Sequence, residues 1–159
     1  MKKAVCMLLL LPCLLMTACQ ADPPSVKETF TLDFEVSQED VRYQGVLDRT
    51  EDSLTLSVAS PYTVKDTVFR YDSAGLSINY GTHAAQANCD YLPSKSIPTV
   101  LYNACAYLSQ ASYTGSDDDA DHYTLPTPYG ECLLTAANGI PTELYDPNSG
   151  LTFHFEAKP

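Results

Sequence analysis

The chain has 159 residues, a formal net charge of −11 and a hydrophobic fraction of 45%, which is the composition of an ordinary globular protein. A chain of this length forms one domain around one core on the usual size scale. The excess of acidic residues argues against nucleic acid and anionic lipid headgroups as partners, because both would repel it.

The N-terminal segment has the composition of an export signal. Two lysines follow Met1, an apolar run covers residues 4–16, and small residues lead to Cys19. The run is shorter than the roughly 20 apolar residues that span a bilayer. We therefore expect residues 1–18 to be a cleaved signal peptide.

The end of this segment resembles the bacterial lipobox. It reads Leu15, Met16, Thr17, Ala18 and Cys19. The resemblance implies that the cysteine thiol receives a lipid and that the chain is cut just before it. Cys19 would then anchor the protein to the extracytoplasmic face of the cell membrane, or to an outer membrane if the host has one. A plain secretion signal cleaved after Ala18 is the alternative.

The chain from Cys19 onward carries 20 acidic and 7 basic side chains, because two of the nine basic residues lie in the signal. Residues 19–28 are polar and contain two prolines, so we expect a disordered tether, with the folded domain in residues 29–159. The remaining thiols leave two possibilities open, one disulfide with one buried thiol or three reduced core cysteines. They belong to Cys89, Cys105 and Cys132.

Alternation of apolar and polar side chains predicts half-buried strands through most of the domain. The first group covers residues 30–36, 41–47, 54–58, 69–71 and 76–80, and the second covers 123–125, 132–134, the region of Leu144, and 151–155. Short turns join neighbours, which favours antiparallel pairing. The predicted fold is mainly β (α+β), a curved antiparallel sheet or open half-barrel of about nine strands.

One amphipathic helix is expected between the two groups of strands, within residues 94–112, where apolar side chains recur at spacings of three and four. Ser96 is the expected N-cap and Pro98 lies in the first turn, where its missing N–H is harmless. We expect the helix to cover the concave face of the sheet, with Cys105 turned toward the strands.

Three parts of the chain carry a family resemblance, namely Tyr-Gln-Gly-Val-Leu at 43–47, residues 69–72 and 75–80, and Asn-Gly-Ile-Pro-Thr-Glu-Leu at 138–144. Together with the order of the predicted elements, they resemble the LolA/LolB-like superfamily of lipoprotein carriers, in a shortened version. It implies an open half-barrel with helices in its concave face. Family members generally begin with a helix before the first strand, whereas here we expect the tether to lead almost directly into Phe30. The basic surface that the periplasmic carrier uses on its partner has no counterpart in a chain this acidic.

The first functional hypothesis is a lipid-anchored, non-enzymatic envelope protein that binds an acyl chain or a lipoprotein's lipid in the half-barrel. The expected cavity residues are Phe34, Leu56, Phe69, Ile78, Leu101 and Leu108. The alternative is a protein-interaction module of the envelope, in sporulation, germination or signalling, without lipid cargo. A weaker third idea is a hydrolase that uses His83, His122 or His154. No cofactor is expected.

Two further features have competing interpretations. Asp117, Asp119 and Asp121 are the residues that would hold a cation if the chain binds one, although the segment lacks the glycine and glutamate of an EF-hand and reads more simply as a solvated loop. The eleven tyrosines either line a cavity under the helix or fill the core. Those on apolar faces are Tyr43, Tyr71, Tyr80, Tyr102 and Tyr107.

Overall fold

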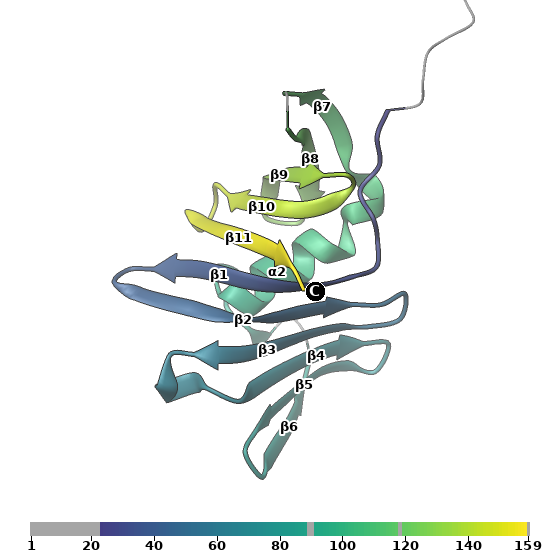
Figure 1. Ribbon diagram of the computed structural model, residues 1–159. Helices are drawn as coiled ribbons and strands as arrows, with labels where there is room; N and C mark the ends of the chain where they lie inside the picture. Colours follow the sequence, from purple (N-terminus) through teal and green to yellow (C-terminus); the bar gives the residue numbers. More distant parts are fainter. Residues whose placement is uncertain (1–22, 89–90, 118, 159) are drawn as a thin grey trace, which may run out of the picture.

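The computed structural model describes residues 23–88, 91–117 and 119–158. These residues form one antiparallel sheet of eleven strands, crossed on one face by an α-helix. In Figure 1 the strands fan out from β7 at one end to β6 at the other, with α2 behind them. Within the described part of the chain, no helix has the length and apolar character needed to cross a membrane.

Six strands precede the helix: β1 (Phe30–Gln38), β2 (Val41–Arg49), β3 (Leu54–Ser60), β4 (Thr67–Asp72), β5 (Gly75–Tyr80) and β6 (His83–Ala87). Five follow it: β7 (Ser112–Ser116), β8 (Asp121–Thr127), β9 (Gly130–Ala137), β10 (Ile140–Asp146) and β11 (Leu151–Ala157). Between them lies α2 (Ile97–Ala106), and the described residues also include the single 3-10 turns η1 (Tyr62–Val64) and η3 (Leu108–Gln110).

The first and last strands of the chain pair in the middle of the sheet. The strand order is β6-β5-β4-β3-β2-β1-β11-β10-β9-β8-β7, so β6 and β7 form the two edges and the sheet stays open. The prediction of a mainly β fold with an open antiparallel sheet is confirmed. The predicted number of about nine strands is wrong, because both edge strands lack the apolar alternation on which the prediction relied.

The core lies between α2 and the inner face of the sheet. Helix residues Val100, Leu101 and Ala104 are buried there, together with Cys105, which faces the sheet as predicted. The predicted N-cap is confirmed by position, since Ser96 has extended backbone angles and its carbonyl accepts the N–H of Val100 at 3.0 Å. Helix α2 begins and ends inside the predicted range of residues 94–112.

Part of the predicted tether is docked on the domain. The N–H of Lys27 donates to the carbonyl of Gly139 at 2.8 Å, and Val26 packs against the core. A Cβ on Gly139 would lie 2.9 Å from the Ser25 carbonyl oxygen, so the glycine allows the close approach. The disorder expected for the tether therefore does not extend to Val26 and Lys27, because one apolar side chain and one backbone hydrogen bond hold them.

Gly45 has no space for a side chain. It is the cross-strand partner of Phe34, whose ring lies over it. A Cβ added to Gly45 would lie 2.1 Å from the Ser57 carbonyl oxygen and 2.7 Å from the Phe34 ring. An aromatic ring covering a strand glycine in this way helps to fix the register of the two strands.

Gly45→Ala is therefore expected to lower the free energy of unfolding by at least about 2 kcal/mol, because the β2–β3 backbone or the Phe34 ring must move. Urea unfolding followed by circular dichroism measures the change. Ser57→Ala is the matched control on the same strand pair and is expected to stay within about 0.5 kcal/mol of the native chain. Equal stability of the native chain and Gly45→Ala would contradict the clash.

Candidate functional site

The concave face under α2 is almost completely filled. Leu101 is 1% exposed and Leu108 is 5% exposed. The void that remains between the helix and the strands has a volume of about 20 Å³. This volume is close to the space that one water molecule occupies, so no acyl chain fits beneath the helix in this conformation.

An apolar pocket of about 190 Å³ opens beside the first turn of α2. Ile97 and Pro98 form its helical wall, and η1 contributes Val64. Ser96, just before the helix, also lines it, and the strands β1 to β4 supply the remaining residues, namely Phe34, Gln38, Tyr43, Leu56, Val58, Thr67 and Phe69. The pocket is smaller than the 300–1,000 Å³ typical of small-molecule sites.

The six residues predicted to line one cavity are divided between separate places. Phe34, Leu56 and Phe69 line the apolar pocket, whereas Leu101 and Leu108 line the small void. Ile78 packs against the edge of the core as a partly buried side chain. Sequence reasoning missed the pocket contributions of Val64 and Pro98, because neither residue belongs to a strand pattern.

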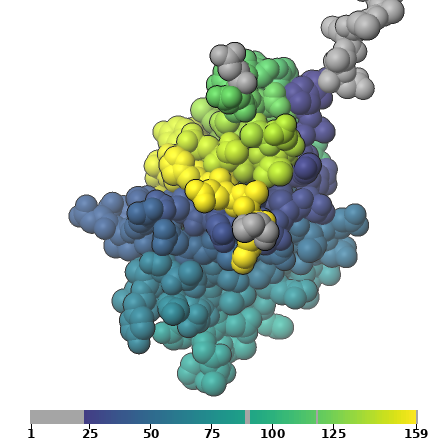
Figure 2. Space-filling view, viewed as in Figure 1, coloured from purple at the N-terminus to yellow at the C-terminus, as the bar shows by residue number. Residues whose placement is uncertain are grey.

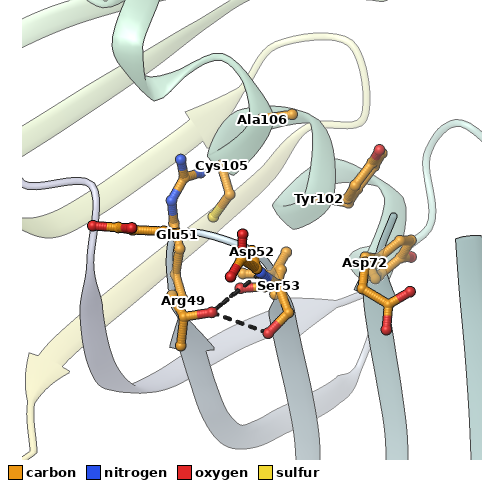
Figure 3. Close-up of a pocket in the computed structure, with 11 residues that line it drawn as sticks. Arg49, Glu51, Asp52, Ser53, Asp72, Tyr102, Cys105 and Ala106 are labelled. Atoms are coloured by element: carbon orange, nitrogen blue, oxygen red, sulfur yellow. Dashed lines mark hydrogen bonds between the residues drawn. The ribbon is translucent and has the colours of Figure 1, made fainter. Parts of the chain in front are cut away.

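A more polar pocket of about 210 Å³ lies beside the last turns of the same helix (Figure 3). Arg49 forms one wall, with its Nε donating to the Glu28 carbonyl oxygen at 2.5 Å and its Nη2 lying 3.9 Å from the Glu28 carboxylate. Tyr102 stands opposite and stacks on Tyr71 at 4.3 Å between ring centroids. Asp52 and Asp72 add carboxylates, so the pocket mixes charged and aromatic groups.

The tyrosines follow both of the predicted alternatives. Tyr71 is buried in the core, Tyr43 lines the apolar pocket and Tyr102 lines the polar one. Tyr80 lies outside these places and is 49% exposed. The rings therefore fill part of the core and also form the walls of two small pockets.

The two described cysteines are buried free thiols. Burial raises the pKa of Cys105 to about 12, with a smaller opposing effect of Arg49. Burial, reinforced by the nearby Asp146 carboxylate, raises the pKa of Cys132 to about 11. Both thiols stay protonated at neutral pH and are poor nucleophiles. Neither forms a disulfide, while Cys89 lies outside the described residues.

The histidines lie in three different parts of the sheet. His122 Nε2 lies 3.0 Å from the Asp117 carboxylate, and His154 Nδ1 lies 3.3 Å from the Glu143 carboxylate. His154 faces solvent as predicted, and His83 lies on the edge strand β6. No two of the three come together beside a nucleophile in the described ranges.

The acidic loop after β7 is organised by its own hydrogen bonds. Asp117 accepts the backbone N–H groups of Asp119 and Ala120 at 3.2 and 3.0 Å. The His122 hydrogen bond, followed by these backbone bonds, lowers the pKa of Asp117. No group of three metal-ligating side chains occurs in the part of the chain that the structure describes, so it does not assemble Asp117, Asp119 and Asp121 into a site.

Comparison with known proteins gives similarity at the level of solved structures. One match is the LolA superfamily protein NE2245 from Nitrosomonas europaea, with 11% identity, a TM-score of 0.44 and coverage of 86% of each chain. Another is a chain in the structure of the CwlD amidase from Clostridioides difficile in complex with the GerS lipoprotein, with 16% identity, a TM-score of 0.42, and coverage of 77% of this chain and 79% of that chain.

Both identities and both TM-scores are low, so the fold of this chain rests on its own strand order. No family model and no curated protein matches the sequence. The predicted signal peptide, residues 1–18, and Cys19 lie outside the described residues, so both the signal peptide and the lipid anchor stay predictions. The function of this chain is therefore argued from its own geometry.

The raised thiol pKa values lead to an alkylation test. Cys105 and Cys132 are expected to resist iodoacetamide at pH 8.5 in the folded chain and to react fully in urea, because burial keeps them protonated and inaccessible. Mass spectrometry of peptides measures the modification. Rapid labelling of either folded thiol would contradict the burial.

The same raised pKa values predict how stability depends on pH. Because the pKa of each thiol is higher in the folded chain than in the unfolded chain, the free energy of unfolding should fall as pH rises from about 9 toward 12.

Proposed function

We propose that this chain is a non-enzymatic lipoprotein of the cell envelope, anchored through lipid on Cys19, whose domain binds another protein rather than carrying lipid. The observation that supports it is the filled concave face, where only about 20 Å³ remains beneath α2. A carrier needs space for its cargo. A recognition domain needs a rigid surface, which the packed helix provides.

The apolar pocket beside Ile97 suits the apolar side chain of a protein partner. Its walls include the rings of Phe34, Tyr43 and Phe69, and its volume is about 190 Å³. Apolar side chains that insert into well-formed aromatic pockets carry much of the binding energy at protein interfaces. The pocket is therefore the proposed anchor point of the interface.

The outer face of the sheet favours a basic partner. Asp33 and Glu156 are directly opposite each other on β1 and β11, and neither has a hydrogen-bonding or ionic partner among the described residues. Like charges in this position are unfavourable. The neighbouring Arg42 is already bonded to Glu35, whose pKa this hydrogen bond lowers. Figure 2 shows this face, which α2 does not cover.

The chemistry of the described side chains supports binding rather than catalysis. The two thiols are buried with raised pKa values, and two histidines lie beside single carboxylates on the surface. A nucleophile aligned with a general base would be needed for hydrolysis.

A hydrophobic ligand is the second candidate. The apolar lining of the pocket at Phe34, Leu56 and Phe69 favours it. The volume admits only the end of one chain, so a whole acyl chain requires α2 to move away from the sheet. Tight packing of Leu101 and Leu108 opposes that movement.

The anchor is tested by fatty-acid labelling of cells that make the full chain. The native chain is expected to carry labelled palmitate and to sediment with membranes, whereas Cys19→Ser should lose the label and leave the membrane fraction. Cys89→Ser is the matched control and should behave as the native chain. Retained label on Cys19→Ser would remove this part of the proposal.

The binding mode is tested with a photoreactive amino acid at Val64, on the wall of the apolar pocket. Irradiation of intact cells should give one discrete adduct with another protein, because the pocket holds the partner's side chain. The same amino acid at Tyr129, an exposed residue away from the pocket, is the control and should give none. Solvent extraction, which leaves the covalent anchor in place, should release no stoichiometric lipid from the purified chain.

A lipid adduct at Val64, or one acyl chain released per molecule, would instead support the carrier function. This outcome leaves the anchor on Cys19 intact, so the two parts of the proposal fail independently.

A further inference from the structure

Strand β6 is an edge strand that makes almost no contribution to the core. Among the described residues it pairs only with β5, and its residues His83 to Gln86 are exposed on both faces of the sheet. In Figure 1 none of the described strands or helices covers its outer side. One row of its backbone N–H and C=O groups is therefore open to another strand.

The features that usually protect a sheet edge are missing from β6. Its sequence is His-Ala-Ala-Gln-Ala, with no proline, no charged side chain and no bulge. The other edge differs, because β7 has a register shift between Tyr113 and Gly115 and leads into the acidic loop at Asp117. Bulges and charges of this kind prevent edge-to-edge pairing. Only one of the two edges is thus protected.

The segment that contains the β5–β6 hairpin also has no charged side chain. Between Asp72 and Asp90 the sequence contains no Asp, Glu, Lys or Arg. The rest of the chain from Cys19 onward has a large acidic excess, so most surfaces of two copies repel each other. The β5–β6 hairpin is the region where two copies approach with the least repulsion.

We propose that β6 pairs with β6 of a second copy, antiparallel, so that two sheets join into one. A two-fold arrangement brings Ala85 opposite Ala85 and Ala84 opposite Gln86. These small or uncharged side chains do not clash or repel across the pair. The strand is therefore complementary to itself, which is the reason to favour a second copy over an unrelated partner. This inference goes beyond the proposed function and does not depend on the lipid anchor.

Single cysteines placed along β6 test the pairing in the membranes of cells that make the full chain. Each cysteine is introduced into the Cys89→Ser chain, which removes the thiol at position 89. The native thiols of the described domain are then Cys105 and Cys132, and both are buried. Paired residues have Cα atoms about 5 Å apart, whereas residues displaced by two positions exceed the roughly 7 Å limit for a disulfide. Ala85→Cys should therefore give a crosslinked dimer under mild oxidation, at least about fivefold more than Ala84→Cys or Gln86→Cys.

Ser112→Cys on the protected edge β7 is the matched control and should give only the background level. A maximum at position 84 or 86 instead of 85 would still show β6 pairing, in a shifted register. Background levels at all three positions, or equal crosslinking at all three, would overturn antiparallel pairing.

A second variant tests the pairing by introducing charge repulsion, and it is measured on the chain purified from membranes in detergent. Ala85→Lys keeps the fold because Ala85 is exposed, but it puts two like charges opposite each other in the pair. Sedimentation equilibrium should show at least about tenfold weaker dimerisation. Association that depended only on net charge would instead become stronger, because the added lysine reduces the acidic excess. Unchanged or stronger dimerisation of Ala85→Lys would overturn the proposal.

Discussion

The packing of α2 against the inner face of the sheet is the interaction on which the rest of the domain depends. A single sheet has an apolar face that must be covered by another layer. Here ten helical residues provide that layer, and Leu101, Leu108 and Phe153 are at most 5% exposed at its centre. Each such side chain contributes about 1.5–3 kcal/mol by burial, so loss of the helix would leave the sheet without a core.

The same packing decides where binding can occur. A helix of ten residues is about 15 Å long, whereas eleven strands extend much further across the sheet. The centre of the inner face is consequently filled, and the open surfaces of that face lie at the ends of the helix and the edges of the sheet. The apolar pocket at Ile97, the polar pocket at Tyr102 and the bare strand β6 all follow from this mismatch in length.

The sequence predicts the features that burial controls and misses the others. The core is predicted correctly from the alternation around Phe34 and Phe153 and from the helical spacing between Ile97 and Leu108. In these elements one face is buried and the other is exposed, so the pattern of apolar residues marks the buried face. Strand β6 escapes prediction because hydrogen bonding to β5 alone maintains it. The division of the expected cavity escapes it as well, since periodicity shows which face a residue lies on but not how closely the helix approaches.

The docked N-terminal segment relates the two proposals to each other. Lys27 is held at the β9–β10 turn by its hydrogen bond to Gly139. The eight residues 19–26 that precede it can reach at most about 28 Å when fully extended. Strand β6 is seven strands away from β10 in the sheet, about 34 Å at the usual strand spacing. Two copies joined through β6 therefore have their anchored ends far apart, on opposite sides of the two-fold axis. If each copy is anchored through Cys19 as proposed, both lipids could enter one bilayer with the joined sheet lying along the membrane, and the outer face and the pockets of both copies would be at the same height.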